Sequence, residues 1–188
     1  MEEVGYLGEA IHQFRGLKKL ADRALARTSE KDFFAKLDEE SNSIALIVKH
    51  LAGNMRSRWS DFLTSDGEKK DRHRDSEFVI EPGDTREDLE RRWNEAWGLL
   101  YSAIEPLAAE DLRRTVTIRG EPHSVLRAIN RQIAHYAYHV GQLVFLAKHF
   151  AGSRWESLSI PRGKSEEFNA RRRDRGVADE PSASRPTS

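Results

Sequence analysis

The sequence predicts an all-α protein organised as a four-helix bundle. Two observations lead to this prediction: four long segments repeat apolar residues at intervals of three and four, and the strand pattern is confined to one short stretch, residues 115–122. The composition agrees, because 38% hydrophobic and 33% charged residues in a chain of 188 are typical of one soluble domain with charged helix surfaces.

The four predicted helices differ in how clearly their ends are marked. The third has the clearest start, since Asp84 or Thr85 can cap it, and Gly152 is expected to stop the fourth. The predicted helices are about Val4–Ala26, about Asp38–Leu63, from Asp84 or Thr85 to near Pro106, and about Ser124–Phe150.

The connections predict how neighbouring helices run. Residues 28–34 are a short connection, and residues 115–122 predict a small β-hairpin or extended arm, because β-branched residues precede a turn that contains glycine. Both suit antiparallel neighbours. Residues 64–83 are highly charged and exceed the ~12 residues that most connections in a compact domain stay below, so this loop is either mobile or functional. Its length also permits a crossover, with the second and third helices parallel.

One domain is expected over residues 1–169, followed by a tail over residues 170–188. The tail holds few apolar residues and two prolines, a composition that favours disorder. Its basic run, Arg171–Arg173, is interpreted as solvated, since no aromatic residues alternate with it as they do in nucleic-acid sites.

Charge and residue usage exclude several classes of function. Lys+Arg and Asp+Glu both total 31, so the chain lacks the positive field that a nucleic-acid partner requires. The acidic start does not resemble a signal peptide, and no apolar run is long enough for a membrane, so a cytoplasmic protein without a membrane partner is expected. The absence of cysteine excludes disulfides, thiolate ligands and a cysteine nucleophile.

Three histidines are candidates for a metal site. His135 and His139, in the segment IAHYAYHVGQ, lie four residues apart on one helix face, where two imidazoles can converge on one ion. His50, in KHLAGN, lies in the most apolar part of the second helix and offers a third ligand. The alternative is three hydrogen-bonded core histidines without a metal. The remaining histidines look ordinary, except that one lies in the long charged loop; they are His12, His73, His123 and His149.

The segments KHLAGN and IAHYAYHVGQ together resemble the DinB-like superfamily of DinB/YfiT-type metalloenzymes, over about residues 1–160. The segments MRSRWSDFLTSDGEK and LSIPRGKSEEFN are similar to one uncharacterised bacterial subgroup of these proteins. The resemblance implies an up-down-down-up four-helix bundle, often a homodimer, that binds a divalent metal through His50, His135 and His139. Zinc or nickel is expected first, with iron or manganese as alternatives. Relatives include transferases and isomerases that use low-molecular-weight thiols such as bacillithiol or mycothiol.

The leading functional hypothesis is a metal-dependent S-transferase that joins a low-molecular-weight thiol to a small electrophile, because three neutral ligands leave an open position on the ion. A hydrolase that uses activated water is the runner-up. The third hypothesis is a non-catalytic metal-binding stress-response bundle with a closed site. In that case Asp71, His73, Asp75 or Glu77 would supply a fourth ligand.

Four further residues are candidates for positioning a substrate, since they lie near the predicted ligands in sequence: Asn54, Arg58, Tyr138 and Gln142. Two tryptophans, Trp59 and Trp93, are expected to pack the core or its rim instead.

Overall fold

A computed structural model describes residues 5–178, and within them the chain is mostly helical. Six α-helices, three short 3-10 helices and one two-stranded antiparallel sheet follow one another. The elements are α1 (Tyr6–Leu25), α2 (Glu30–Phe34), α3 (Ile44–Trp59), η1 (Arg74–Phe78), α4 (Arg86–Ile104), η2 (Ala109–Arg113), β1 (Thr115–Ile118), β2 (Glu121–Ser124), α5 (Val125–Ala151), η3 (Gly152–Arg154) and α6 (Ser165–Ala178).

Three of the long helices begin at a hydroxyl side chain that accepts a backbone N–H of the first turn. Ser43 caps α3, Thr85 caps α4 and Ser124 caps α5. At the other end of α5, Gly152 has φ of +56°, a left-handed conformation that favours glycine, so the predicted stop is confirmed.

Helix α3 is shorter than predicted at both ends. Before it, the Asp38 carboxylate accepts the backbone N–H of Ser41 at 2.8 Å, which stabilises a turn in place of a helix. After it, Asp61 adopts φ of +49° and ends the helical path. Residues 28–34, expected to be only a short connection, contain the helix α2. The Ser29 side chain caps this helix by accepting the backbone N–H of Asp32.

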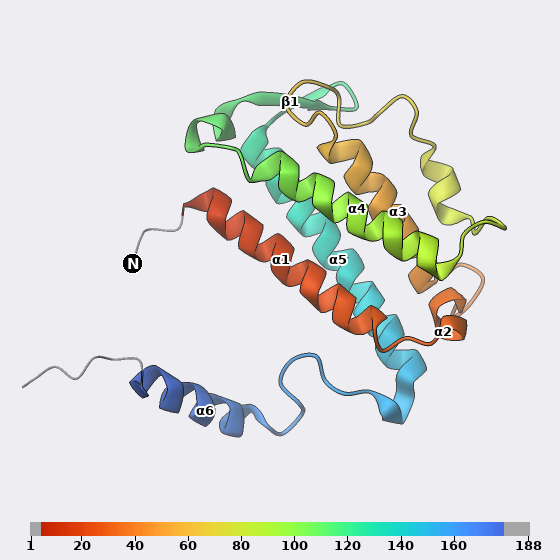
Figure 1. Cartoon of the computed structure of the whole chain (residues 1–188), viewed down its shortest axis with the longest axis vertical. Helices are drawn as coiled ribbons and strands as arrows, with labels where there is room; N and C mark the ends of the chain where they lie inside the picture. The colour runs from red at the N-terminus through yellow and green to blue at the C-terminus, as the bar shows by residue number, and fades with distance from the viewer. Residues whose placement is uncertain (1–4, 179–188) are drawn as a thin grey trace, which may run out of the picture. The chain divides into compact units, whose positions relative to one another are not determined.

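The directions of the four long helices follow from contacts between their ends. The Tyr6 hydroxyl donates to Asn130 near the start of α5, so α1 and α5 start together. Lys49 of α3 pairs with Asp84 just before α4, so α3 and α4 also start together. Arg86 at the start of α4 donates to the carbonyl of Leu25 at the end of α1. Figure 1 shows the result: α3 and α4 run in one direction and α1 and α5 in the other.

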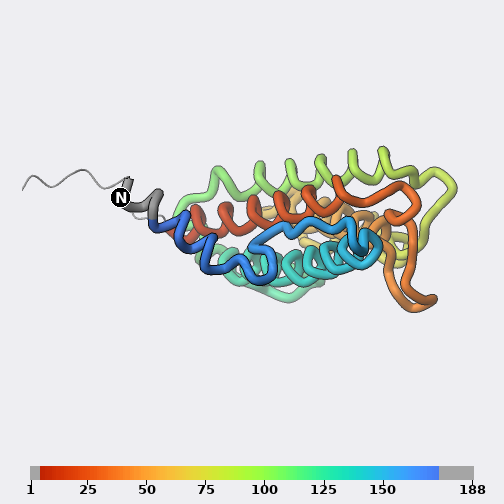
Figure 2. The backbone as a smooth tube through the Cα atoms, turned by 90° about the horizontal axis from the view of Figure 1, so that it is seen from below, coloured from red at the N-terminus to blue at the C-terminus, as the bar shows by residue number. Residues whose placement is uncertain are grey.

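These helices form two layers, α1 beside α4 and α3 beside α5, as Figures 1 and 2 show. The space between the layers is filled by aromatic side chains. Phe14 meets Trp59 and Trp97 edge-on at 5.9 and 6.4 Å between ring centroids, and Trp93 meets Trp97 at 5.4 Å. Such edge-to-face pairs add to the hydrophobic stabilisation of the core. Trp59 and Trp93 are therefore core residues, as predicted.

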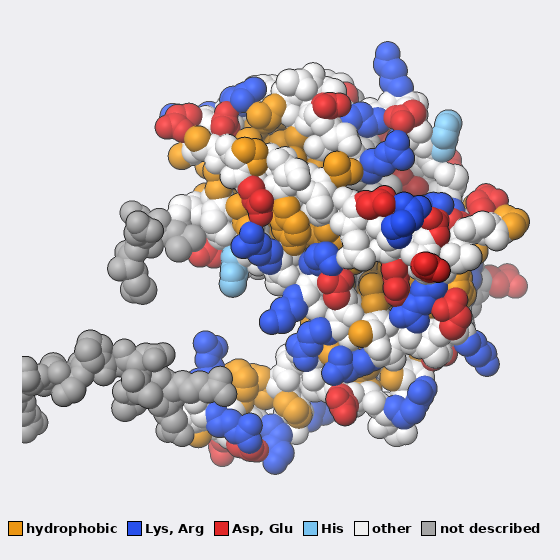
Figure 3. Space-filling model, viewed as in Figure 1, with side chains coloured by type: hydrophobic (Ala, Val, Ile, Leu, Met, Phe, Trp, Pro, Cys, Tyr) orange, Lys and Arg blue, Asp and Glu red, His pale blue; other side chains and the backbone are white. Residues whose placement is uncertain are grey.

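The outward face of α1 and α4 carries charges of both signs. Figure 3 shows basic and acidic side chains interspersed over it, with apolar ones between them. Several of these charges pair one helical turn apart, as Arg86 does with Glu90 at 2.7 Å and Arg91 with Glu95 at 2.8 Å.

The predicted hairpin is confirmed by β1 and β2, which pair from Thr115 with Ser124 to Ile118 with Glu121. Its two turn residues, Arg119 and Gly120, both have positive φ, as the turn favoured for a two-residue hairpin requires. The hairpin is attached to the long loop, because Asp66 accepts both turn N–H groups, at 2.9 and 2.8 Å.

The chain divides into two compact units, residues 1–153 and 154–188. The second contains α6, which crosses residue 170, where the sequence predicts the tail to begin; the last part of that tail lies outside the described residues. Within the described residues, no helix combines the length and the apolar character that a membrane span needs.

Candidate metal centre

Two helices bring the three predicted histidines together. His50 projects from α3, and His135 and His139 project from one face of α5. The Nε2 atoms of His50 and His135 are 3.4 Å apart, and the ring of His139 lies 4.9 Å from each of the other two rings, measured between centroids. One ring nitrogen of each histidine lies within 4.8 Å of the other two.

This geometry fits a divalent cation. Two nitrogens bound at about 2.0–2.1 Å to a tetrahedral zinc ion would lie about 3.3–3.4 Å apart, close to the separation found between His50 and His135. A ligand imidazole must also be neutral. Burial and the neighbouring histidines lower the pKa of His135 to about 3, and burial and His50 lower the pKa of His139 to about 4. Both rings are therefore neutral at pH 7 and offer lone pairs.

The side of His50 that faces away from the cluster is held by Glu77. Oε2 of Glu77 accepts a hydrogen bond from Nδ1 of His50 at 2.8 Å, which leaves the lone pair on Nε2 of His50 for the cluster. Burial acts to raise the pKa of Glu77, but hydrogen bonds from His50 and Arg72 and the charge of Arg72 outweigh it, so this pKa is lowered. A carboxylate on the outer nitrogen of a histidine is the usual support of a metal ligand.

His139 has a similar outer partner. The Gln142 side-chain oxygen lies 2.9 Å from Nδ1 of His139 and accepts its hydrogen, so that Nε2 faces the cluster. Gln142 is one turn further along α5, and the helix itself sets this contact. Two of the three rings are thus fixed in the orientation that metal binding requires.

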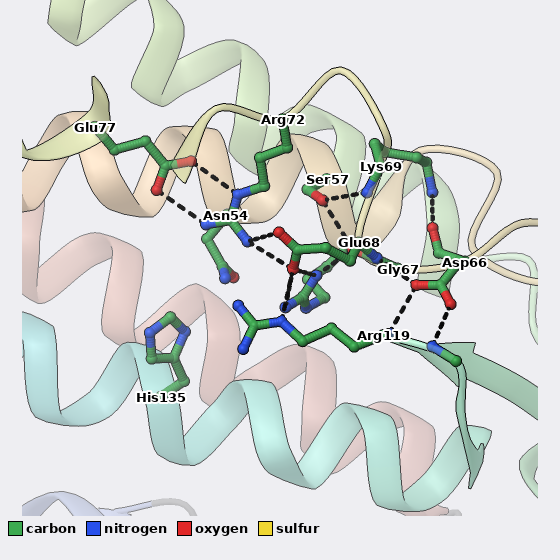
Figure 4. A network of polar contacts seen from close by, with 12 residues as sticks. Asn54, Ser57, Asp66, Gly67, Glu68, Lys69, Arg72, Glu77, Arg119 and His135 are labelled. Atoms are coloured by element: carbon green, nitrogen blue, oxygen red, sulfur yellow. Dashed lines mark hydrogen bonds and ion pairs between the residues drawn. The ribbon is translucent and has the colours of Figure 1, made fainter. Parts of the chain in front are cut away.

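The long loop is fastened to the helices, not free. Figure 4 shows Arg72 reaching between Glu77 and Glu68. Its Nε lies 2.8 Å from Glu77, and its Nη1 lies 3.3 Å from Glu68. Arg58 of α3 donates to Glu68 through both terminal nitrogens, at 3.0 Å each. These contacts hold Glu77 against His50.

The four residues proposed to position a substrate lie in different surroundings. Tyr138 is 55% exposed and its ring lies 4.3 Å from that of His139, while Gln142 bonds to the same histidine. Asn54 is buried and accepts from the Tyr136 hydroxyl at 3.2 Å. Arg58 is buried and directed to the loop. Tyr138 and Gln142 are therefore the two that adjoin the cluster.

The loop does not add a fourth ligand to the cluster of three. Asp71 and Asp75 have side chains 78% and 104% exposed, and His73 is exposed as well. Glu77 reaches His50 from the outer side. Among the described residues, the group able to hold an ion consists of the three histidines alone. The role of Glu77 as an outer support was not predicted, since only its position in the charged loop drew attention to it.

Glycine at position 53 allows this close approach of the loop. A Cβ at Gly53 would lie 2.4 Å from Oε1 and 2.8 Å from Cδ of Glu77, closer than atoms can pack. At an open site in a helix, such as Gly98 in α4, alanine is expected to stabilise the protein by about 0.5–1 kcal/mol.

Alanine at position 53, unlike alanine at an open helical site, is expected to be destabilising. Gly53→Ala should lower the free energy of unfolding by about 1 kcal/mol or more, because Glu77 must move away from His50 and Arg72. The free energy of unfolding in urea measures it, with Gly98→Ala as the matched control. Equal stabilisation by both substitutions would contradict the close packing of Glu77 on α3.

The structure defines a helical protein with a candidate three-histidine metal centre. Comparison with protein families assigns the chain more closely: residues 2–164 match the family described as "Protein of unknown function (DUF1572)", and the chain belongs to this family. No curated protein and no solved structure matches the chain.

Proposed function

We propose that this chain is a DinB-like, metal-dependent enzyme that transfers a low-molecular-weight thiol to a small electrophile. The observation on which the proposal rests is the cluster of His50, His135 and His139, whose ligand nitrogens lie within 4.8 Å of one another with no fourth side chain of the described residues among them. Three neutral ligands leave an ion at least one position for an exchangeable partner.

The arrangement of the helices supports a DinB-like four-helix bundle. Helices α3 and α4 run together, opposed to α1 and α5, which is the up-down-down-up order that the resemblance implies. His50 in the second long helix and the pair His135 and His139 in the fourth occupy the expected elements. The homodimer, the cytoplasmic location and the absence of a nucleic-acid partner remain predictions.

A divalent cation in this centre supplies the charge that lowers the pKa of a thiol, or of water in the hydrolase alternative. The protein's own residues prepare the site for it. Glu77 and Gln142 orient the rings of His50 and His139, and burial keeps His135 and His139 neutral. Since the chain contains no cysteine, the sulfur nucleophile must come from a cosubstrate.

Activity assays on the full chain test this function and separate it from hydrolysis. Protein loaded in turn with zinc, nickel, iron(II) or manganese is offered small thiols together with an aryl halide or an epoxide, and separately esters and amides. We expect metal-dependent loss of the thiol with formation of a thioether. Metal-dependent turnover of the esters or amides alone would favour the hydrolase, and inactivity in every assay would favour the non-catalytic alternative.

Glu77→Gln tests the outer support of the centre. The amide oxygen can still accept from His50, but the lost charge leaves Arg72 under-compensated and makes His50 a weaker ligand. We expect metal affinity to fall about 10–100-fold. Competition with a chromophoric chelator measures it, and Asp75→Asn, a change at a fully exposed carboxylate of the same loop, is the control. Unchanged affinity in Glu77→Gln would show that Glu77 does not support the ligand.

A further inference from the structure

Two aromatic side chains flank the histidine cluster. Phe78, at the end of η1, lies 4.8 Å from His50 between ring centroids and is tilted by only 31° from its plane. Tyr138 of α5 lies 5.2 Å from His135 and 4.3 Å from His139. His135 is partly exposed and Tyr138 is 55% exposed, so this is a side from which solvent reaches the cluster.

A guanidinium group lies beside one of these two rings. Cζ of Arg74 is 5.0 Å from the centroid of Phe78. The ion pair of Arg74 with Asp75 spans 3.8 Å, and the two side chains are 50% and 104% exposed. A pair of this kind contributes little and is readily exchanged.

Arg74 is half exposed and weakly paired, unlike the other two arginines near the centre. Arg72 and Arg58 are buried and bonded to carboxylates at 2.8–3.0 Å, Arg72 to Glu77 and Arg58 to Glu68. These two cations and two carboxylates cancel one another. A cation bound to three neutral histidines would therefore keep its charge uncompensated, with Arg74 adding a further positive charge beside Phe78, which flanks the cluster. Such a field favours an anionic ligand.

We propose that the open side of the histidine cluster is a subsite for a carboxylate-bearing substrate, with Arg74 pairing with the carboxylate and Phe78 and Tyr138 packing against its apolar body. This rests on the proposed function and adds to it the chemical class of the ligand. The guanidinium can form two parallel hydrogen bonds to a carboxylate, which a neutral analogue cannot reproduce. The rings supply apolar surface that selects a carbon skeleton over a bare inorganic anion.

Two thiols with the same number of carbons, one anionic and one neutral, provide the test: 3-mercaptopropionate and 3-mercapto-1-propanol. Cobalt(II)-loaded full-length protein is titrated with each, and the change in the visible spectrum reports binding at the metal without any turnover. We expect the wild-type protein to bind the carboxylate thiol about tenfold more tightly or better. Arg74→Gln should bring the two affinities to near parity, and Arg56→Gln, at an arginine 76% exposed on α3, should leave the difference unchanged.

A third ligand, 3-phenylpropionate, separates this inference from the proposed function. It carries the carboxylate and an apolar body but no thiol, and its binding to the loaded protein is followed by calorimetry. If neither thiol alters the cobalt spectrum, the thiol-transferase proposal is contradicted. The subsite is then judged by 3-phenylpropionate, whose binding should be weakened about tenfold in Arg74→Gln and also reduced in Tyr138→Leu.

The inference is overturned alone if both thiols bind with equal affinity and Arg74→Gln changes neither. It is also overturned if 3-phenylpropionate fails to bind or binds the wild type and Arg74→Gln equally. Because Arg74 is half exposed and weakly paired, the variant should keep the wild-type melting temperature, which circular dichroism checks.

Discussion

Alanine in place of His139 is expected to reduce the metal content of the purified protein from about one ion per chain to less than about a tenth of that. The substitution removes one of three ligands, and a site left with two histidines does not hold a divalent ion against dilution. The loss of affinity should exceed the roughly 10–100-fold that removal of an outer contact causes. His50→Ala is expected to behave in the same way, since both histidines are buried in the cluster.

Elemental analysis of protein loaded and then desalted measures this effect. His149→Ala is the matched control, because His149 lies on the same helix α5 but is exposed and outside the cluster. It should retain the metal. If the wild-type protein carries no stoichiometric metal after loading, or if His139→Ala carries as much as the control, the three histidines are core residues without a ligand role.

Arg72→Ala is expected to have the largest effect on stability, about 3–5 kcal/mol in the free energy of unfolding. The side chain of Arg72 is 5% exposed and that of Glu77 8%, so removal of the guanidinium leaves a buried carboxylate without its cation. Glu68 loses part of its pairing as well. Arg56→Ala is the control, because its pair with Asp71 spans 3.9 Å between exposed groups and should contribute less than about 1 kcal/mol.

Urea denaturation of the metal-free proteins provides the measurement, so that metal binding does not contribute. A loss below about 1 kcal/mol in Arg72→Ala would mean that water replaces the guanidinium and that the loop is not fastened by this network. Recovery of most of the lost free energy of unfolding in Arg72→Lys would in turn show that charge, more than the shape of the guanidinium, holds Glu77 in place.

The helices and the cluster could be predicted because they depend on local periodicity. Apolar spacing, with Gly152 as the expected stop, predicted α5 to within one residue at each end, and the four-residue interval put His135 and His139 on one face. The position of His50 beside them depends on how α3 packs against α5, and the sequence only suggested this packing. The hairpin followed from a β-branched run and a turn that contains glycine.

The contacts that lie outside local periodicity could not be predicted. Glu77 meets His50 across 27 positions, and nothing in the charged loop distinguishes it from Asp71 or Asp75 until the chain is folded. The early part of the predicted second helix is diverted by the turn at Asp38, where side-chain bonding competes with the helix. Gly53 carries no sequence signal at all, because its reason is the approach of a distant carboxylate.

The attachment of Glu77 to His50 has a consequence for the motions of the loop. The loop that carries Glu77 supports His50 only while it is packed on α3. A metal ion that binds only this packed form stabilises it by an amount that grows with the concentration of the ion above Kd. Amide hydrogens of residues 72–78 should therefore exchange with deuterium more slowly in loaded protein than in free protein. The rate at which a protease cuts this loop would then report whether the buried centre is occupied.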